Sequence, residues 1–137
     1  YFNVYGPAQP GDSPYSTVVS AWCHKALNNE PLRSDGDGNQ TRDMIYVSDV
    51  VDANLAVAGY KTLPNRIYNV GSGSSVSNNE ILKIFSSHGY SNVKNAPARK
   101  GDVRHTLSDC SRLQSIGWLP KVNFADGLQR VLDYWGL

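Results

Sequence analysis

Apolar side chains recur every three to four residues in four long segments of the 137-residue chain, and they alternate with polar ones in shorter segments. The first spacing is typical of helices that bury one face, and the second is typical of strands. We predict helices over residues 16–28, 48–61, 78–89 and 123–135, and strands over residues 1–5, 32–34, 44–47 and 66–70, with residues 93–98 extended. Because helices and strands are mixed along the chain, the predicted fold class is α/β, a mixed α+β unit with a small sheet and flanking helices.

Three serines stand where a helix is predicted to begin. Ser77 precedes Glu80 by three residues, which matches the capping box that satisfies free amides at a helix N-terminus. Ser48 and Ser108 each precede an apolar periodic segment, so we predict that they cap helices as well. The short helix after Ser108 is expected to end at Gly117, since glycine is favoured at that position.

Residues 36–51 combine a glycine-rich turn, an arginine and an apolar strand that runs directly into a helix. The turn suits a tight reversal of the chain. Arg42 lies between turn and strand, and its planar guanidinium is well shaped to hold a phosphate with two hydrogen bonds. The alternative is that Arg42 pairs with Asp37 or Asp43 and only braces the loop.

Other polar side chains with ligand-binding chemistry stand where predicted loops and strands meet: Asn3, Arg99, Asp102, Arg104 and His105. Two arginines from distant parts of the chain would hold one diphosphate if the fold brings them together. A nearby aspartate would then accept hydrogen bonds from a ribose diol. The alternative is a set of surface ion pairs.

Two glycines at positions 71 and 73 follow a predicted strand and precede a helix, an order typical of phosphate-binding turns. The third glycine of the dinucleotide motif is absent, so a plain linker is the alternative. The three histidines share no metal-ligand spacing, and no nucleophilic or paired-carboxylate arrangement stands out. We therefore predict no catalytic residue and no metal site.

Bulk properties narrow the classes of partner. A formal net charge of +1 argues against nucleic acid or an anionic membrane as the main partner. No apolar run approaches the length of a membrane span. Cys23 and Cys110 are predicted to be free thiols in a reducing cytoplasm, with a disulfide between them as the alternative. The chain begins in what is predicted to be a buried strand, so we expect it to be part of a longer protein.

Five segments resemble, in the same order, motifs of the extended short-chain dehydrogenase/reductases that act on nucleotide sugars. They are Tyr-Phe-Asn-Val-Tyr-Gly-Pro at 1–7, the stretch 36–51, Ile-Tyr-Asn-Val-Gly-Ser-Gly at 67–73, Arg-Lys-Gly-Asp-Val-Arg-His at 99–105 with Ser-Asp-Cys-Ser-Arg at 108–112, and Ile-Gly-Trp-Leu-Pro at 116–120. The resemblance covers nearly the whole chain. It is strongest to the C-terminal half of UDP-glucose and UDP-N-acetylglucosamine 4-epimerases.

The resemblance implies a binding role for eleven residues. Phe2 would lie against the nicotinamide end of NAD, and Asn3 would bond the sugar or the diphosphate. Thr17 and Val18 would line the nucleotide-sugar site, and Arg33, Ser34 and Asp35 would lie beside the uracil. Arg42 and Arg99 would clamp the diphosphate, Asp102 would accept hydrogen bonds from the ribose hydroxyls, and Thr106 would stand at a gate beside the hexose. Because Thr106 is fairly small, the resemblance further implies tolerance of N-acetylhexosamines.

The resemblance also implies the activity of the longer protein, an NAD-dependent UDP-hexose or UDP-N-acetylhexosamine 4-epimerase of polysaccharide biosynthesis. Residues 1–137 would form its single C-terminal substrate-binding domain, with residues 1–7 in the Rossmann sheet and the Rossmann half absent. The family's glycine-rich NAD fingerprint and its catalytic Tyr-x-x-x-Lys pair have no counterpart here. We therefore expect no NAD bound to this chain and no activity from it alone. A nucleotide-sugar 4,6-dehydratase, or a non-catalytic binding or assembly module, is the alternative.

The expected partner is a UDP-sugar, with no nucleic acid and no membrane. In the parent enzyme the strand at residues 1–5 would have sheet partners from the Rossmann half. Without them it would expose an apolar edge that invites pairing. We expect this strand to be disordered, rearranged or paired with a second copy, and a homodimer formed through it is a further expectation.

Overall fold

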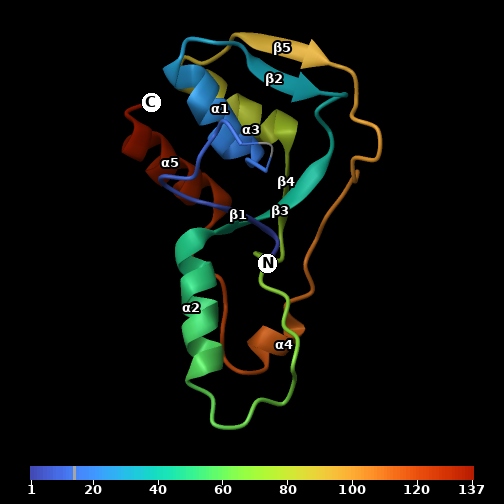
Figure 1. Cartoon of the computed structure of the whole chain (residues 1–137), viewed down its shortest axis with the longest axis vertical. Helices are drawn as coiled ribbons and strands as arrows, with labels where there is room; N and C mark the ends of the chain where they lie inside the picture. The colour runs from blue at the N-terminus through green and yellow to red at the C-terminus, as the bar shows by residue number, and fades with distance from the viewer. Residues whose placement is uncertain (14) are drawn as a thin grey trace.

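Figure 1 shows a computed structural model of the protein, which describes residues 1–13 and 15–137. The molecule is elongated, with α2 and α4 towards one end and the strands β2 and β5 at the other. The elements are β1 (Asn3–Tyr5), α1 (Val18–Leu27), β2 (Leu32–Asp35), β3 (Thr41–Tyr46), α2 (Val47–Ala58), β4 (Ser75–Ser77), α3 (Asn78–Ser87), β5 (Val93–Ala96), α4 (Ser111–Gln114) and α5 (Phe124–Trp135).

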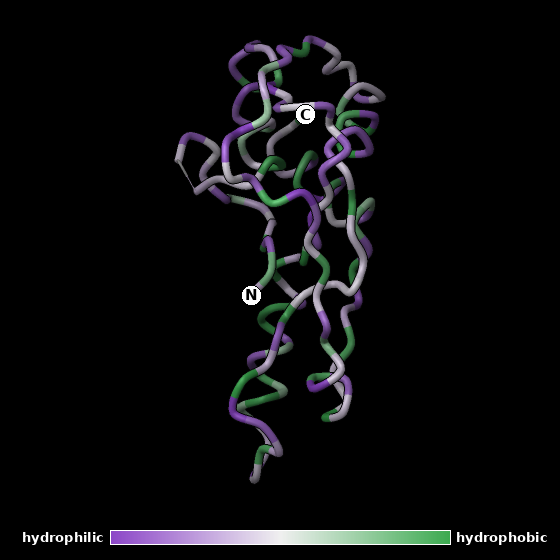
Figure 2. Tube along the Cα trace, turned by 90° about the vertical axis from the view of Figure 1, so that its right-hand side faces the viewer, coloured by the Kyte–Doolittle hydropathy of each residue, from purple (hydrophilic) through white to green (hydrophobic). Residues whose placement is uncertain are grey.

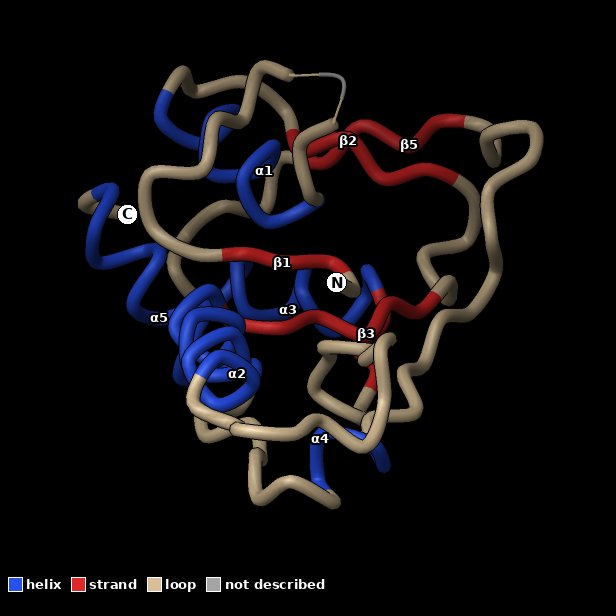
Figure 3. The backbone as a smooth tube through the Cα atoms, turned by 60° about the horizontal axis from the view of Figure 1, so that its bottom comes forward, coloured by secondary structure: helices blue, strands red, loops and turns tan. Residues whose placement is uncertain are grey.

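The strands form two small sheets. The larger has the order β1-β3-β4. In it β1 is parallel to β3, with Asn3 opposite Met44, and β4 is antiparallel to β3, with Ser77 opposite Thr41. In Figure 3, β1 and β3 run side by side across the middle of the molecule. The smaller sheet is the parallel pair β2 and β5. The α/β fold class predicted from the sequence is confirmed.

Strand β3 divides the interior into two hydrophobic clusters. Successive side chains of a strand point to opposite faces. Met44 and Tyr46 therefore join one cluster and Ile45 joins the other. The first cluster also contains Tyr5, Val19, Trp22, Cys23, Ala26, Leu32, Ile81, Phe85, Leu128, Val131 and Leu132. The second contains Val50, Ala53, Val70, Cys110, Leu113, Ile116 and Trp118.

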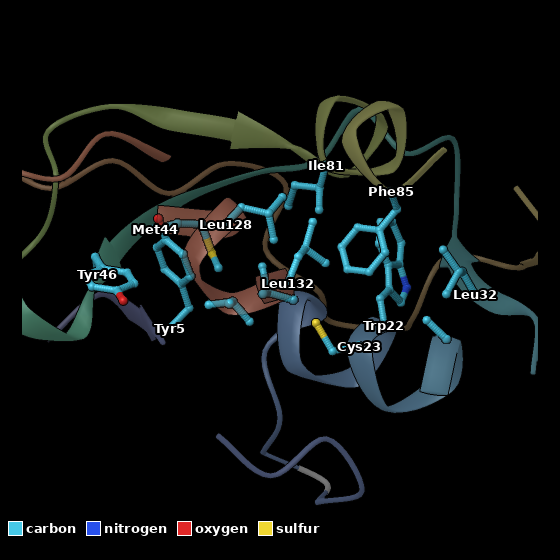
Figure 4. Packing of buried hydrophobic residues seen from close by; sticks show 13 residues of the cluster. Tyr5, Trp22, Cys23, Leu32, Met44, Tyr46, Ile81, Phe85, Leu128 and Leu132 are labelled. Atoms are coloured by element: carbon cyan, nitrogen blue, oxygen red, sulfur yellow. The ribbon is translucent and has the colours of Figure 1, made fainter. Parts of the chain in front are cut away.

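Aromatic side chains organise the first cluster (Figure 4). The rings of Trp22 and Phe85 meet edge to face, with centroids 5.6 Å apart, and Tyr5 meets Tyr46 at 5.5 Å. Such pairs stabilise a core beyond the area they bury. The indole Nε1 of Trp22 donates to the carbonyl of Arg33 at 2.8 Å, and this bond ties α1 to β2.

Both cysteines are free and buried, Cys23 in the first cluster and Cys110 in the second. The prediction of free thiols is confirmed. Burial raises the pKa of the Cys23 thiol to about 12, because the charged thiolate is poorly solvated there.

Hydrophobic and hydrophilic stretches alternate along the trace in Figure 2. Within the described residues, no helix has both the length and the apolar character that crossing a membrane requires.

The helical periodicity predicts α1, α2, α3 and α5 to within a few residues of their ends. Ser77 forms the predicted capping box, in which its hydroxyl accepts from the Glu80 amide and the Glu80 carboxylate accepts from the Ser77 amide at 2.7 Å. The two other cap predictions are wrong. Helix α2 begins at Val47, so Ser48 lies inside it. Helix α4 begins after Cys110, because Ser108 donates its hydroxyl to a buried carboxylate instead.

The predicted strand over residues 66–70 is also wrong, since this segment is not a strand. A strand needs a neighbour that matches its register, and a pattern of strand-forming side chains does not supply one. Two of its carbonyls accept hydrogen bonds from elsewhere in the chain, Val70 from the Phe2 amide at 2.9 Å and Ile67 from Arg112 Nη1 at 3.1 Å.

The expectation that residues 1–5 would be disordered or rearranged is wrong as well, whereas pairing with a second copy stays a prediction. Strand β1 pairs with β3, which the same chain supplies. Part of its other edge is also satisfied, because the side-chain amide of Gln9 donates to the Val4 carbonyl at 3.1 Å.

Candidate functional site

A cleft of about 340 Å³ lies between the N-terminal part of α1, strand β2 and strand β3. Four of its lining side chains are cationic and two are acidic, so the cleft favours an anionic ligand. The lining residues are Asn3, Ser16, Thr17, Val18, Ala21, Trp22, Lys25, Arg33, Asp35, Gln40, Arg42, Met44, Asn78, Arg99 and Asp102.

One wall of the cleft is the start of α1. Thr17 is the N-cap of this helix, and its hydroxyl accepts from the amide of Ser20. The first amides of a helix have no partner within the helix, and together with the helix dipole they favour negative charge. The lining residues Thr17 and Val18 are therefore positioned where an anionic ligand is stabilised.

A second wall is built around Asp35. Arg33 and Asp35 are two residues apart on β2 and point to the same face. The Asp35 carboxylate accepts from Arg33 Nε at 2.7 Å and from Arg99 Nε at 2.6 Å. Burial alone would raise the pKa of Asp35, but the hydrogen bonds from the two guanidinium groups outweigh it and hold the pKa below its ordinary value. Asp35 is therefore ionised at neutral pH and fixes both arginines.

A third wall carries Arg42 and Asp102. Arg42 Nη2 donates to Asp102 Oδ1 at 2.6 Å, and its Nη1 donates to the Thr41 carbonyl at 2.9 Å. The side chain of Arg42 is 18% exposed, so this guanidinium is held firmly beside the cleft. The proposed pairing of Arg42 with Asp37 or Asp43 is wrong, because Asp37 accepts two hydrogen bonds from Arg104 instead.

Asp43 is fully buried and connects β3 with the segments around Ser72 and Ser108. Its carboxylate accepts five hydrogen bonds, from the amides of Ser72, Gly73 and Ser108 and from the hydroxyls of Ser72 and Ser108, at 2.5–3.1 Å. Burial alone would raise the pKa of Asp43, but the hydrogen bonds from Ser108 and Ser72 lower it below its ordinary value. The carboxylate is therefore ionised at neutral pH, and no side chain in the described part of the chain forms a salt bridge with it.

The hydrogen bonds to Asp43 decide whether Gly71 and Gly73 belong to a phosphate-binding turn or to a plain linker. The amides of Ser72 and Gly73, which a phosphate would need, donate to Asp43 at 2.7 and 3.1 Å. The turn therefore surrounds an internal carboxylate, which favours the linker interpretation. Gly71 is required here, because a Cβ atom at this position would lie 2.3 Å from Ser108 Oγ.

Eight of the eleven residues predicted to bind substrate or cofactor line the one cleft. They are Asn3, Thr17, Val18, Arg33, Asp35, Arg42, Arg99 and Asp102. Their binding roles stay predictions, since proximity alone does not identify a ligand. Asn3 is fixed by donation from its side-chain amide to the Asp43 carbonyl at 2.8 Å.

The other three predicted residues lie outside the cleft lining. Ser34 is buried within β2. The amide of Phe2 is bonded to the Val70 carbonyl. The hydroxyl of Thr106 accepts from the Asp43 amide at 3.1 Å, which anchors the segment before Ser108 to β3. The roles of these three residues beside uracil, NAD and hexose also stay predictions.

The sequence-based prediction did not include several residues that line the cleft, among them Trp22, Gln40 and Asn78. Gln40 braces β2 by donating from its side-chain amide to the Asp35 carbonyl at 2.9 Å. Trp22 belongs to the apolar stripe of α1, and its periodicity indicated only burial. No local signal distinguished these residues from ordinary core and loop positions. The described residues include no group of three His, Cys, Asp or Glu side chains that could hold a metal ion.

Comparison with known proteins identifies the family. Residues 1–71, slightly more than half of the chain, match the model of the NAD dependent epimerase/dehydratase family. The chain belongs to this family. The match includes β1, the start of α1, β2 and β3, and therefore most of the walls of the cleft. The family resemblance inferred from the five sequence motifs is confirmed.

Solved structures of epimerases share the fold. The UDP-glucose 4-epimerase of Thermotoga maritima, in a structure with UDP-glucose, has a TM-score of 0.89 and 34% identity over 99% of this chain. The UDP-N-acetylglucosamine 4-epimerase of Methanobrevibacter ruminantium, in complex with UDP-N-acetylmuramic acid, has a TM-score of 0.88 and 36% identity over 98% of this chain. A protein of Methanocaldococcus jannaschii, provisionally named UDP-glucose 4-epimerase, is 36% identical over 137 residues.

These relatives are much longer than this family member. The chain covers 44% of each of the two solved structures and 43% of the Methanocaldococcus jannaschii protein. More than half of each of these relatives therefore has no counterpart in the 137 residues of this chain.

Proposed function

We propose that this chain is the substrate-binding portion of an NAD-dependent nucleotide-sugar 4-epimerase, and that its cleft holds the diphosphate and ribose of a UDP-sugar. The observation that carries the proposal is the convergence of Arg42, Arg99 and Asp102 on one cleft from distant parts of the chain. Guanidinium groups suit the diphosphate, and a carboxylate suits the ribose diol.

The charge of the cleft supports a ligand with two negative charges. Lys25, Arg33, Arg42 and Arg99 outnumber Asp35 and Asp102 by two. A diphosphate diester carries two negative charges at neutral pH, so it would neutralise this excess. The N-terminus of α1 adds further stabilisation for an anion.

Four of the lining residues have a proposed partner in the ligand. Arg42 and Arg99 bond the diphosphate, Asp102 accepts from the ribose hydroxyls, and Asn3 bonds the sugar or the diphosphate. Because Asp102 and Arg42 are paired 2.6 Å apart, each presents an already oriented group to adjacent parts of the nucleotide. Thr106 is proposed to stand beside the hexose, where its small side chain leaves room for an N-acetyl group.

We assign NAD to the longer enzyme and not to this chain. The glycine-rich turn at residues 71–73 does not fit a dinucleotide, because Asp43 uses its amides. NAD supplies hydride chemistry at the sugar when bound to such an enzyme, and in that enzyme Phe2 would lie against its nicotinamide end. Residues 1–137 are proposed as one C-terminal substrate-binding domain of a cytoplasmic enzyme of polysaccharide biosynthesis, with residues 1–7 continuing the Rossmann sheet.

The diphosphate part of the proposal is tested by comparing UDP with uridine in isothermal titration calorimetry. We expect UDP to bind at least about tenfold more tightly, because charge-assisted hydrogen bonds to the diphosphate are worth more than neutral ones. Added salt should weaken the binding of UDP more than that of uridine. Equal affinities for the two ligands would rule out a diphosphate site. The isolated chain is expected to show no turnover of UDP-glucose.

A homodimer is also proposed. Strand β1 lies at the edge of its sheet, and beside it α2 exposes Val47, Val51 and Leu55 at successive turns. An apolar stripe next to a strand edge is a suitable surface for self-association about a twofold axis. We expect light scattering after size exclusion to give twice the 15.0 kDa mass of one chain. Leu55→Lys should restore the monomer, and a monomeric wild-type chain would contradict the proposal.

A further inference from the structure

Asp35 joins two arginines that come from different parts of the chain. Its carboxylate is 13% exposed, whereas the side chains of Arg33 and Arg99 are 55% and 63% exposed. Both arginines use only Nε for this contact. Among the described residues, neither guanidinium makes a hydrogen bond through its two outer nitrogens.

The position of Asp35 is itself fixed by the backbone. Strand β2 pairs with β5, where Asp35 lies opposite Ala96, and the Gly36 amide donates to the Ala96 carbonyl at 2.9 Å. The Asp35 carbonyl accepts from Gln40 Nε2 at 2.9 Å. A carboxylate held on a paired strand is a precise anchor for the groups bonded to it.

The geometry of a guanidinium makes this contact useful. When Nε is held by a carboxylate, the two outer nitrogens still present parallel N–H groups that match the oxygens of a phosphate. An exposed arginine normally loses rotamer freedom when it binds a ligand. In this chain Arg33 and Arg99 have lost part of that freedom before any ligand arrives.

We propose that Asp35 is a positioning residue that presents the outer N–H groups of Arg33 and Arg99 to a nucleoside diphosphate. The inference rests on the proposed function of the cleft and extends it, since it gives Asp35 a role in ordering the cationic groups. Asp35 itself makes no contact with the phosphates, because two anions repel each other.

Neutralising Asp35 separates a positioning effect from a simple charge effect, because the two predict opposite changes in the affinity for UDP. Asp35→Asn removes a negative charge from the cleft, which by itself would strengthen the binding of an anion. Positioning predicts weaker binding, because asparagine holds a guanidinium less strongly than a carboxylate does. The sign of the change in affinity therefore separates the two effects.

The test measures the affinity of the full 137-residue chain for UDP by isothermal titration calorimetry. We expect Asp35→Asn to bind UDP about tenfold more weakly than the wild type, and Asp35→Glu to lose less, because it keeps the carboxylate. Asp37→Asn is the matched control. Asp37 lies in the turn that follows β2 and binds Arg104, but it does not line the cleft. Its replacement should therefore change the affinity for UDP less than about twofold.

A double-mutant cycle with Arg99→Ala provides a second measurement. If Asp35 acts through Arg99, the loss caused by Asp35→Asn should be smaller in the Arg99→Ala background than in the wild type. Additive losses, or unchanged or tighter binding by a folded Asp35→Asn variant, would overturn the inference while leaving the cleft as the UDP site. Failure of the wild-type chain to bind UDP would overturn the proposed site and this inference together. Circular dichroism melts check that each variant is folded.

Discussion

Replacing Asp43 with alanine is expected to lower the free energy of unfolding by about 3–5 kcal/mol, because five donors lose a buried ionised acceptor at once. These donors hold the segments around Ser72 and Ser108 against β3. Asp43→Asn should also destabilise the protein, since its side-chain NH₂ group would face some of the same donors. Urea denaturation monitored by circular dichroism measures the change.

Asp109→Ala is the matched control for this substitution. Asp109 is exposed and accepts from the Ser111 amide at the start of α4, so its loss should cost about 1 kcal/mol or less. Equal losses for the two variants would contradict a special role for the buried carboxylate.

The contribution of Asp43 should also depend on pH. Its pKa in the folded protein lies below the ordinary value of 3.8, because the hydrogen bonds from Ser108 and Ser72 outweigh the effect of burial. Such a group contributes its full stabilisation above pH 3.8, and that stabilisation is lost as the pH falls through the folded-state pKa. The stability difference between the wild type and Asp43→Asn should therefore be constant near neutral pH and shrink in acid below pH 3.8.

Replacing Arg42 with alanine is expected to weaken UDP binding by about 2–3 kcal/mol, a factor of about 30–150. The guanidinium is mostly buried and already oriented by Asp102 and the Thr41 carbonyl, so a ligand gains its hydrogen bonds at little entropic cost. Its removal would also leave the Asp102 carboxylate without a cation beside the diphosphate. Arg42→Lys should recover part of the affinity, because it restores the charge but not the planar pair of donors.

Arg104→Ala is the control for Arg42→Ala. Arg104 also binds an aspartate, through two hydrogen bonds to Asp37, but it does not line the cleft. Isothermal titration calorimetry should show less than about a twofold change for this variant. Comparable losses for the two arginines would indicate a general electrostatic effect and not a ligand contact at Arg42.

Much of the fold could be predicted because the signals are local. The apolar stripe of α5 and the capping box of Ser77 lie within a few turns of one helix, where side-chain spacing decides which face is buried. The errors occurred where a local signal had a distant competitor. Ser108 has the composition of a helix cap, but its hydroxyl bonds Asp43, which is 65 residues away. Residues 66–70 have the composition of a strand but lack a matching neighbour.

The candidate site was predictable in its residue types and not in its contacts. The order of motifs indicated Arg42, Arg99 and Asp102 as binding residues, and all three line one cleft. The alternative pairing of Arg42 with Asp37 or Asp43 was wrong, because both carboxylates are near in sequence but occupied by other groups. Cleft residues such as Gln40 carried no motif that marked them.

By itself the sequence determined the main helices, the cap at Ser77, the α/β class and the family, since these follow from periodicity and from the order of short motifs. The tertiary structure alone decided which charged groups meet. Asp102 reaches Arg42 across 60 residues, and Arg99 reaches Asp35 across 64. The physical reason is that an ion pair between distant residues depends on how the sheets bring β2, β3 and the segment after β5 together, and no local pattern encodes that arrangement.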